Sequence, residues 1–206
     1  MSALLSSSYF PNIQYLSKFL IYDNILIEQF DSYSKQSYRN RCEILSANTV
    51  QTLTVPVKKN KYTYTKDILI DYSEDWQKNH IRAIMSAYKN SAFYDFFEEE
   101  ISSIIMSKEK YLTELNTKTL NFLMKVIDIN KQYSFTEKYL KPGNFKDYRN
   151  TIHPKKRMQK ADKYFNPKKY SQVFSDRFDF VPNLSCLDLI CNEGQESLKV
   201  LKESIC

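Results

Sequence analysis

The stretch Ile25-Leu-Ile-Glu-Gln-Phe30 is a short apolar run rich in β-branched residues, and the polar sequence Asp31-Ser-Tyr-Ser-Lys-Gln-Ser-Tyr-Arg-Asn-Arg41 follows it directly. An apolar run of this length predicts a buried strand. Binding sites are usually assembled on polar loops at the ends of such strands, because the rigid scaffold positions the side chains. Residues 28–41 are therefore the first candidate for a functional site.

Further strands are expected on the C-terminal side of this run. Residues 41–45 and 50–57 flank the turn Ser46-Ala-Asn-Thr49 and predict a hairpin of the same sheet. A strand is also predicted at residues 67–72, beyond a polar connection at 58–66, and another at 170–174. The short apolar start at residues 3–5 is assigned to no element.

Helices are indicated by apolar residues at helical spacing and by N-cap residues. The predicted helices cover residues 12–22, 75–89, 92–106, 110–127, 184–191 and 195–203. The pattern as a whole predicts one α/β domain over residues 1–206, in which a small mixed sheet packs with about four to six helices.

Residue counts exclude several classes of site. The 206 residues include two glycines, Gly143 and Gly194, and two histidines, His80 and His153, and the members of each pair lie far apart. A Gly-rich loop that holds phosphate through backbone N–H groups is therefore excluded, as are paired histidine ligands one helical turn apart. The four cysteines form no Cys-x-x-Cys and are expected to be reduced thiols. We accordingly predict no cofactor and no metal.

The N-terminal residues give no reason to expect a targeting signal. The first basic residue is Lys18, so the charged start of a secretory signal is missing. No apolar run approaches the ~18 residues needed to cross a bilayer. These observations predict a cytoplasmic protein without a membrane span.

The positive charge is concentrated in residues 141–169, which we interpret as a basic loop insertion, although the formal net charge of the whole chain is only +6. This segment holds two acidic residues, Asp147 and Asp162, and ten basic ones: Lys141, Lys146, Arg149, Lys155, Lys156, Arg157, Lys160, Lys163, Lys168 and Lys169. It is interpreted as a solvated loop, as a flap that binds phosphate or an acyl-carrier surface, or as an RNA-binding segment. The RNA hypothesis is the least favoured and rests on interleaved aromatic residues that can stack on bases: Tyr148, Tyr164, Phe165 and Tyr170.

Within residues 28–41, the side chains of Lys35, Arg39 and Arg41 are suited to clamp a phosphate or carboxylate. Glu28 or Asp31 is suited to act as a base or to accept a hydroxyl hydrogen. Arg39 and Arg41 face the same side if the chain is extended there, which favours a site. The alternative is that these charges form local ion pairs that keep an edge strand soluble.

Three further side chains are candidates for chemistry. His80 borders the apolar stripe of the predicted helix 75–89, so it is either a core histidine or a general base. His153 precedes Pro154 in the basic segment, where a lowered pKa and mobility make it a weaker candidate. Cys42 follows Arg41, which suggests a lowered thiol pKa and a nucleophilic role, against the alternative of a core cysteine in a strand.

An ordered set of segments resembles the WbqC-like proteins, a bacterial family found in gene clusters for O-antigen and other surface polysaccharides. The segments are Tyr9-Phe-Pro11, Lys35-Gln-Ser-Tyr-Arg-Asn-Arg41, Leu53-Thr-Val-Pro-Val57, Asp75-Trp-Gln-Lys-Asn-His-Ile-Arg82, Phe93-Tyr-Asp-Phe-Phe97, Leu115-Asn116 and residues 180–194. Their order and spacing carry the resemblance, which is strongest to the short members from Bacteroidetes. Many members have a His-Gln-Pro before the Tyr-Phe-Pro, whereas this chain has Leu5-Ser-Ser-Ser8. If that histidine is catalytic in relatives, this chain has another mechanism or lacks the activity.

The resemblance implies a transferase that moves an acyl or aminoacyl group to an amino-sugar nucleotide, with an acyl-carrier protein as a further partner. In this hypothesis the catalytic residues are His80, Glu28 and Asp188. The residues that hold the anionic substrate or orient its polar groups are Lys35, Arg39, Asn40, Arg41, Arg82 and Glu193. The alternatives are a binding or assembly protein of the same pathway without catalysis, and the RNA-binding module.

Overall fold

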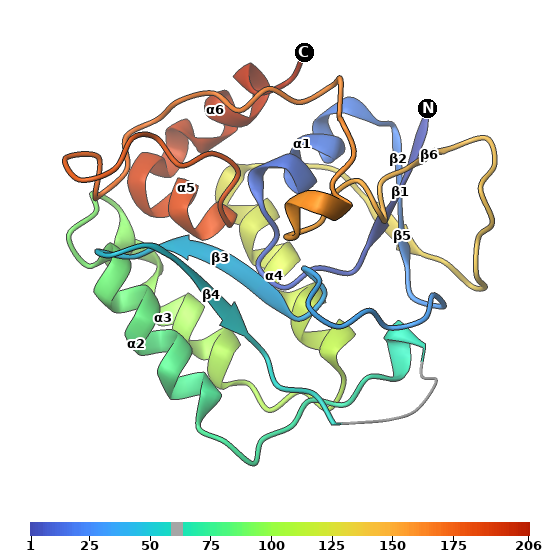
Figure 1. The fold of residues 1–206 in the computed structure, drawn as a ribbon, viewed down its shortest axis with the longest axis horizontal. Coiled ribbons are helices and arrows are strands. Elements are labelled where there is room, and N and C mark those ends of the chain that lie inside the picture. Colours follow the sequence, from blue (N-terminus) through green and yellow to red (C-terminus); the bar gives the residue numbers. More distant parts are fainter. Residues whose placement is uncertain (59–63) are drawn as a thin grey trace.

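The computed structural model describes residues 1–58 and 64–206, and its core is a four-stranded parallel sheet (Figure 1). The strands are β1 (Ser2–Ser6), β2 (Asn24–Glu28), β5 (Tyr133–Phe135) and β6 (Lys146–Asp147), in the order β5-β2-β1-β6. In β1, Ala3, Leu4 and Leu5 are fully buried, as expected of a central parallel strand covered on both faces. The predicted strand at 25–30 is β2, whereas β1 was assigned to no element.

The predicted hairpin forms a second, antiparallel sheet of two strands, β3 (Arg41–Leu45) and β4 (Val50–Thr54). The turn is closed by the Ser46 backbone N–H, which donates to the Thr49 carbonyl at 3.0 Å. β3 packs against α2 and α5 instead of extending the parallel sheet (Figure 1). The α/β class is confirmed, but the strands divide between two sheets and not one.

The six α-helices agree with the sequence expectations within a few residues. They are α1 (Ile13–Ile21), α2 (Trp76–Tyr88), α3 (Tyr94–Met106), α4 (Leu112–Ile127), α5 (Cys186–Glu193) and α6 (Ser197–Glu203). Asn12 caps α1 by accepting from the Tyr15 backbone N–H, and Ser185 caps α5 by accepting from that of Leu187. The N-cap of α3 is Phe93, and the hydroxyl of the nearby Ser91 donates to the Tyr88 carbonyl at the end of α2.

Two strand predictions were wrong. Residues 67–72 make only single bridges, at Leu69 and Ile70, after a 3-10 turn at Thr65–Asp67. Residues 59–63 of the connection before them lie outside the described part of the chain. Residues 170–174 form no strand, because the Gln172 side chain holds this segment by donating to the Val181 carbonyl and accepting from its N–H.

Among the described residues, none of the helices combines the length and the apolar character needed to cross a bilayer.

Candidate functional site

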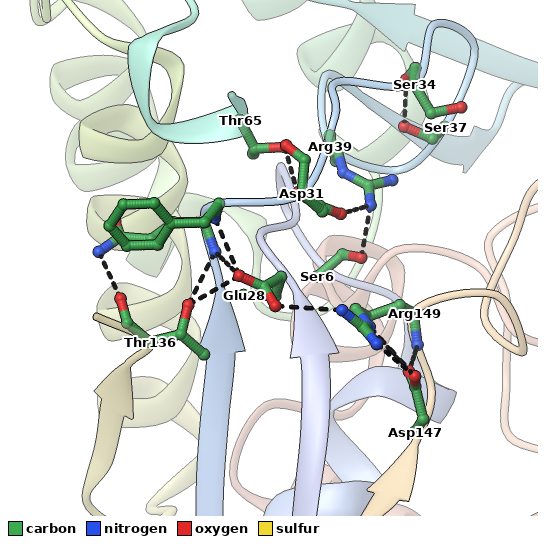
Figure 2. A network of polar contacts seen from close by, with 12 residues as sticks. Ser6, Glu28, Asp31, Ser34, Ser37, Arg39, Thr65, Thr136, Asp147 and Arg149 are labelled. Atoms are coloured by element: carbon green, nitrogen blue, oxygen red, sulfur yellow. Dashed lines mark hydrogen bonds and ion pairs between the residues drawn. The ribbon is translucent and has the colours of Figure 1, made fainter. Parts of the chain in front are cut away.

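The order of the parallel strands defines one edge of the sheet as the place for a site. From β1 the chain adds β2 and then β5 on one side, and it returns with β6 on the other side of β1. The chain thus leaves β1 towards β2 on one side and reaches β6 on the opposite side, so the strand order reverses between β1 and β6. In open parallel sheets, ligands bind in the crevice outside the carboxyl ends of the strands at such a point. Here these ends carry Ser6, Glu28, Thr136 and Asp147 (Figure 2).

Glu28 ends β2 and is completely buried, yet both of its carboxylate oxygens are fully engaged. Oε1 accepts from the Phe30 backbone N–H at 2.9 Å and from the Thr136 hydroxyl at 2.8 Å. Oε2 accepts from the Leu140 N–H at 3.0 Å and from the Arg149 guanidinium at 3.1 Å. These bonds compensate for burying the charge and fix the ends of β2 and β5 against the segment after β6.

Arg149 joins the two sides of the sheet edge. Its Nη1 donates to Glu28, and its Nε and Nη2 donate to Asp147 at 3.0 and 2.6 Å. Burial acts to raise the pKa of Asp147, but the hydrogen bonds and charge of Arg149 outweigh it and hold this pKa below its usual range. The Tyr139 ring covers the guanidinium at 5.0 Å from its centroid. All three guanidinium nitrogens of Arg149 are therefore committed within the protein.

A second ion pair lies beside the first. Arg39 is 7% exposed, and its Nη2 donates both to Asp31 and, at 2.8 Å, to the hydroxyl of Ser6 at the end of β1 (Figure 2). Asp31 also accepts from the Thr65 hydroxyl. The Nε atom of Arg39 is buried and has no hydrogen-bond partner among the described residues. Arg39 thus retains donor capacity that the fold does not use.

The two ion pairs border a cleft of about 550 Å³, which we call the Arg39 cleft. Its wall includes Asp31, Arg39, Tyr64, Tyr139, Arg149 and His153. This volume lies within the range of about 300–1,000 Å³ that is typical of small-molecule sites, and guanidinium and aromatic groups converge on it. The cleft is therefore the candidate binding site.

His153 is ordered in this wall and 8% exposed. Its Nδ1 accepts from the Lys155 backbone N–H at 3.0 Å, so the neutral ring carries its proton on Nε2. Burial lowers the pKa of His153, and the positive charges of Arg39, Lys155 and Arg41 lower it further. The lowered pKa matches the sequence expectation, but the ring is held in place by its neighbours and its backbone.

The other predicted residues of the 35–41 loop take different positions. Lys35 is exposed and does not line the cleft. The amide of Asn40 donates to the Val55 carbonyl at 2.9 Å and so ties the loop to the residue after β4. Arg41 begins β3, is partly buried, and has a buried Nε without a hydrogen-bond partner in the described chain. Of the three residues of the predicted cationic clamp, Arg39 lines the cleft, whereas Lys35 and Arg41 do not.

The predicted catalytic residue His80 lies in the core, on α2, and is 4% exposed. Its Nδ1 is 3.0 Å from the Tyr9 hydroxyl, and its ring packs edge-on against Trp76. Burial lowers the pKa of His80 to about 4, so the ring is neutral at pH 7. Arg82, also on α2, is exposed. Neither side chain lines the Arg39 cleft.

Asp188 and Glu193, predicted as site residues, both hold the segment 170–172 onto α5. Asp188 accepts from the Tyr170 hydroxyl at 2.6 Å and from the Gln172 amide at 2.9 Å, while Glu193 accepts from the Ser171 backbone N–H at 3.1 Å. Burial raises the pKa of Asp188. These two residues do not line the cleft that Glu28 supports.

Cys42 is 1% exposed in β3, and burial raises the pKa of its thiol, with a further contribution from Glu43. The lowered thiol pKa expected from its neighbour Arg41 was wrong, and the core interpretation of this cysteine agrees with the structure.

The basic segment is partly integrated into the fold. Lys146 and Asp147 form β6, Tyr148 is buried with its hydroxyl 2.8 Å from that of Tyr22, and the Tyr170 hydroxyl is committed to Asp188. Two of the four aromatic residues considered for base stacking are therefore engaged in the protein. This arrangement favours a small-molecule site over an RNA-binding surface.

Sequence patterns do not mark Ser6, Thr136 and Asp147 as site residues, and they favour His80 over His153. Ser6 follows the apolar residues 3–5, so an assignment of these as a strand would have placed Ser6 at the sheet edge. β5 and β6 have three and two residues, which is too short for a period to be recognised. No signal near Thr136 or Asp147 marks them in the sequence.

Comparisons with known proteins give a family and one relative. The model described as "WbqC-like protein family" matches residues 6–179, which include the Arg39 cleft but neither Asp188 nor Glu193. An uncharacterized protein of Mycobacterium tuberculosis is 30% identical over 125 residues, which are 59% of this chain and 51% of that protein. The chain thus matches about half the length of this relative. No solved structure matches the chain significantly.

Proposed function

Since this chain belongs to the WbqC-like protein family, we propose that it acts in surface-polysaccharide biosynthesis and binds an amino-sugar nucleotide in the Arg39 cleft. The reaction that we propose is the transfer of an acyl or aminoacyl group to the sugar amine. A cytoplasmic location is part of the proposal.

One observation carries the proposal: the cleft of about 550 Å³ lies at the carboxyl edge of the parallel sheet and has the guanidinium group of Arg39 in its wall. A guanidinium group recognises phosphate in two-pronged fashion, and a sugar nucleotide carries a diphosphate. The aromatic rings of Tyr64 and Tyr139, each about half exposed along the same cleft, are suited to pack against a base or sugar.

In the proposed transfer, the amine nitrogen of the sugar forms a bond to the acyl carbon while the carbon–sulfur bond of a thioester carrier breaks. The amine loses a proton and the departing thiolate gains one. Asp31 is the carboxylate on the cleft wall and is the residue proposed to accept the proton. Exposed basic residues between 141 and 169, such as Lys160 and Lys163, would face an acidic carrier protein.

The proposed site does not use His80, Arg82, Asp188 or Glu193, because their side chains are exposed elsewhere or engaged outside the cleft. A second candidate function is binding without catalysis in the same pathway. It is favoured by the engagement of the carboxylates at the sheet edge, since Glu28 and Asp31 each pair with an arginine. A carboxylate oxygen that already accepts from a guanidinium group is less available to take a proton from a substrate.

Thermal unfolding with a panel of amino-sugar nucleotides, their N-acetylated forms and coenzyme A tests the proposal. A ligand at ~100 times its Kd stabilises the folded state by about 2.7 kcal/mol, which raises the Tm by roughly 5–10 °C for a chain of this size. An unchanged Tm with every sugar nucleotide would contradict the proposal. Amide formation measured by mass spectrometry with an acyl-thioester donor then separates the transferase from the binding protein, with Asp31→Asn as the variant that should lose turnover and keep binding.

A further inference from the structure

We propose that a second cleft binds the phosphate group of the acyl donor, a thioester of phosphopantetheine. The inference rests on the proposed function, because it names the donor of that reaction and the site that holds it. The cleft has a volume of about 480 Å³, and we call it the Lys160 cleft. The side chains of its wall that could contact a phosphate are Lys146, Thr151, Lys160, Lys163 and Tyr164.

The Lys160 cleft is separate from the Arg39 cleft, but one ion pair connects their walls. Among the described residues, none lines both clefts. Asp147 lines the Lys160 cleft and Arg149 lines the Arg39 cleft, and Oδ2 of Asp147 is 2.6 Å from Nη2 of Arg149 (Figure 2). A transfer reaction needs two substrates, and neighbouring clefts can hold a donor and an acceptor together. The long pantetheine chain lets the phosphate and the thioester of the donor occupy different clefts.

Three lysines give the Lys160 cleft its positive charge. Lys146, Lys160 and Lys163 are exposed, and none of them forms an ion pair within the described chain. The ammonium group of a lysine carries three donors and binds phosphate as a point charge. The three side chains are therefore available to an anion in this cleft.

The two carboxylates of the wall do not cancel this charge, because each is already paired with a cation of the fold. Asp162 pairs at 2.6 Å with the fully buried Lys18, so this pair is neutral. Asp147 shares Arg149 with Glu28, so these three side chains carry a net charge of −1. Against them stand the three lysines, which leaves an excess of +2 around the cleft. This excess suits a phosphate group, whose charge at pH 7 is about −1 to −2.

Thr151 supplies a neutral donor at a fixed position. It is 8% exposed, and its backbone N–H donates to the Tyr148 carbonyl at 3.1 Å in the turn after β6. Its hydroxyl makes no hydrogen bond within the described residues, and it is not one of the fully buried atoms that lack a partner, so it retains accessible surface. A hydroxyl in the wall of a cleft can donate to a phosphate oxygen.

The second segment of the wall, residues 160–164, is attached to the core by Asp162. Besides the ion pair with Lys18, Asp162 accepts from the Gln14 amide at 2.9 Å and from the Tyr164 backbone N–H at 3.2 Å. These contacts fix the backbone between Lys160 and Lys163. The cleft is therefore formed by two anchored segments of the chain.

An adjoining hollow can receive the part of the donor beyond the phosphate. It has a volume of about 310 Å³ and shares Lys146 and Tyr164 with the Lys160 cleft. Tyr22 and Phe145 add aromatic rings to its wall. Such rings are suited to pack against apolar or aromatic groups.

Calorimetric titration of the full chain with 4′-phosphopantetheine and with pantetheine tests the phosphate contact, since the two probes differ in the phosphate alone. 4′-Phosphopantetheine should bind roughly 10- to 100-fold more tightly, as expected for charged hydrogen bonds. Equal affinity for the two probes, or no binding of 4′-phosphopantetheine, would overturn the proposal.

Two further titrations place the donor. A saturating amino-sugar nucleotide should leave the affinity for 4′-phosphopantetheine unchanged, because it occupies the other cleft, whereas competition between the two ligands would contradict a second site. Coenzyme A distinguishes the sources of the phosphate. Tighter binding of coenzyme A than of 4′-phosphopantetheine supports the site with coenzyme A as donor, and equal or weaker binding supports it with the arm of a carrier protein.

Variants locate the phosphate in the Lys160 cleft. Lys160→Met/Lys163→Met should weaken binding of 4′-phosphopantetheine roughly tenfold or more and leave that of pantetheine unchanged. Lys141→Met/Lys169→Met is the matched control, because it removes the same charge from exposed positions of the same segment that line neither the cleft nor the adjoining hollow. Thr151→Val should weaken binding about 2- to 10-fold through loss of one hydrogen bond. Wild-type affinity of Lys160→Met/Lys163→Met, or an equal loss in the control variant, would refute the site.

The two proposals fail separately. If a sugar nucleotide raises the Tm but 4′-phosphopantetheine does not bind, the Lys160 cleft is refuted as the donor site and the sugar-nucleotide site stands. If 4′-phosphopantetheine binds through Lys160 and Lys163 but no sugar nucleotide raises the Tm, the phosphate site stands and the proposed function is refuted.

Discussion

Replacement of Lys18 by Met tests how the basic segment is attached to the fold. Lys18 is fully buried on α1, and its Nζ is 2.6 Å from Oδ2 of Asp162, whose side chain is 4% exposed. Asp162 also accepts from the Gln14 amide at 2.9 Å and from the Tyr164 backbone N–H at 3.2 Å. Lys18→Met retains the aliphatic packing but leaves the carboxylate buried with those two bonds alone.

Loss of one partner of a buried pair costs about 3–5 kcal/mol. Because Asp162 keeps two hydrogen bonds, we expect the lower value, about 3 kcal/mol, which corresponds to a Tm decrease of roughly 6–12 °C at pH 7 for a chain of this size. In the wild type, burial acts to raise the pKa of Asp162, but Lys18 and Gln14 outweigh it and lower this pKa. Without Lys18 the pKa rises, so the carboxyl group protonates and the deficit shrinks as the pH falls towards about 4.

Thermal unfolding followed by circular dichroism at pH 7 and pH 4.5 measures both effects. Lys163→Met is the matched control, because Lys163 is exposed and adjacent to Asp162, and it should change stability by less than about 0.5 kcal/mol. The double variant Lys18→Met/Asp162→Leu should recover most of the loss, since apolar replacement of a buried ion pair is often neutral. A single variant as stable as wild type at pH 7 would refute the reasoning.

Three further predictions concern other sites. Gly194→Ala should lower the free energy of unfolding by about 1–3 kcal/mol, because Gly194 has φ +52° and an added Cβ would lie 2.6 Å from the Phe93 ring. Urea unfolding measures this change, and an unchanged urea midpoint would contradict the prediction. His80→Asn should lower the Tm at pH 7 but leave nucleotide affinity unchanged. Burial lowers the pKa of His80 to about 4, so the wild type loses stability from this residue as the pH falls below about 6.5. The variant should not show this loss. Asp147→Asn should reduce the loss of stability below pH 4. Arg149 lowers the pKa of Asp147, and the resulting stabilisation is lost when acid protonates this carboxylate. An unaltered dependence of stability on acid pH would count against the Asp147–Arg149 ion pair.

The long elements were predictable because their patterns are local. α4 repeats its buried residues over 16 positions, which is enough for a helical period to be recognised. The short strands β5 and β6 were not predictable, since in the described part of the chain they pair with β2 and β1, which lie far away in sequence. Residues 170–174 show the opposite error, because a strand-like composition is held by the Gln172 side chain instead of a neighbouring strand.

The predicted segment 28–41 contributes residues to the candidate cleft, but the sequence did not indicate which of them line it. Residues 28–41 follow a buried strand, and they supply Asp31 and Arg39 to the cleft. Nothing in the local sequence separates the buried Arg39 from the exposed Lys35, because their burial depends on Ser6 and on residues beyond 146. For the same reason the sequence suggests that His153 is mobile beside Pro154, although it lies with Arg39 in the wall of the cleft.

Charge balance explains why the net charge of residues 141–169 does not by itself indicate where an anion would bind. Most of the lysines of this segment are exposed, and Arg149 forms ion pairs with Glu28 and Asp147. The cationic side chains that line the Arg39 cleft are Arg39, from the 35–41 loop, and Arg149. An anion in the Arg39 cleft would therefore lie against Arg39, and its affinity should depend more on Arg39 than on the number of surface lysines.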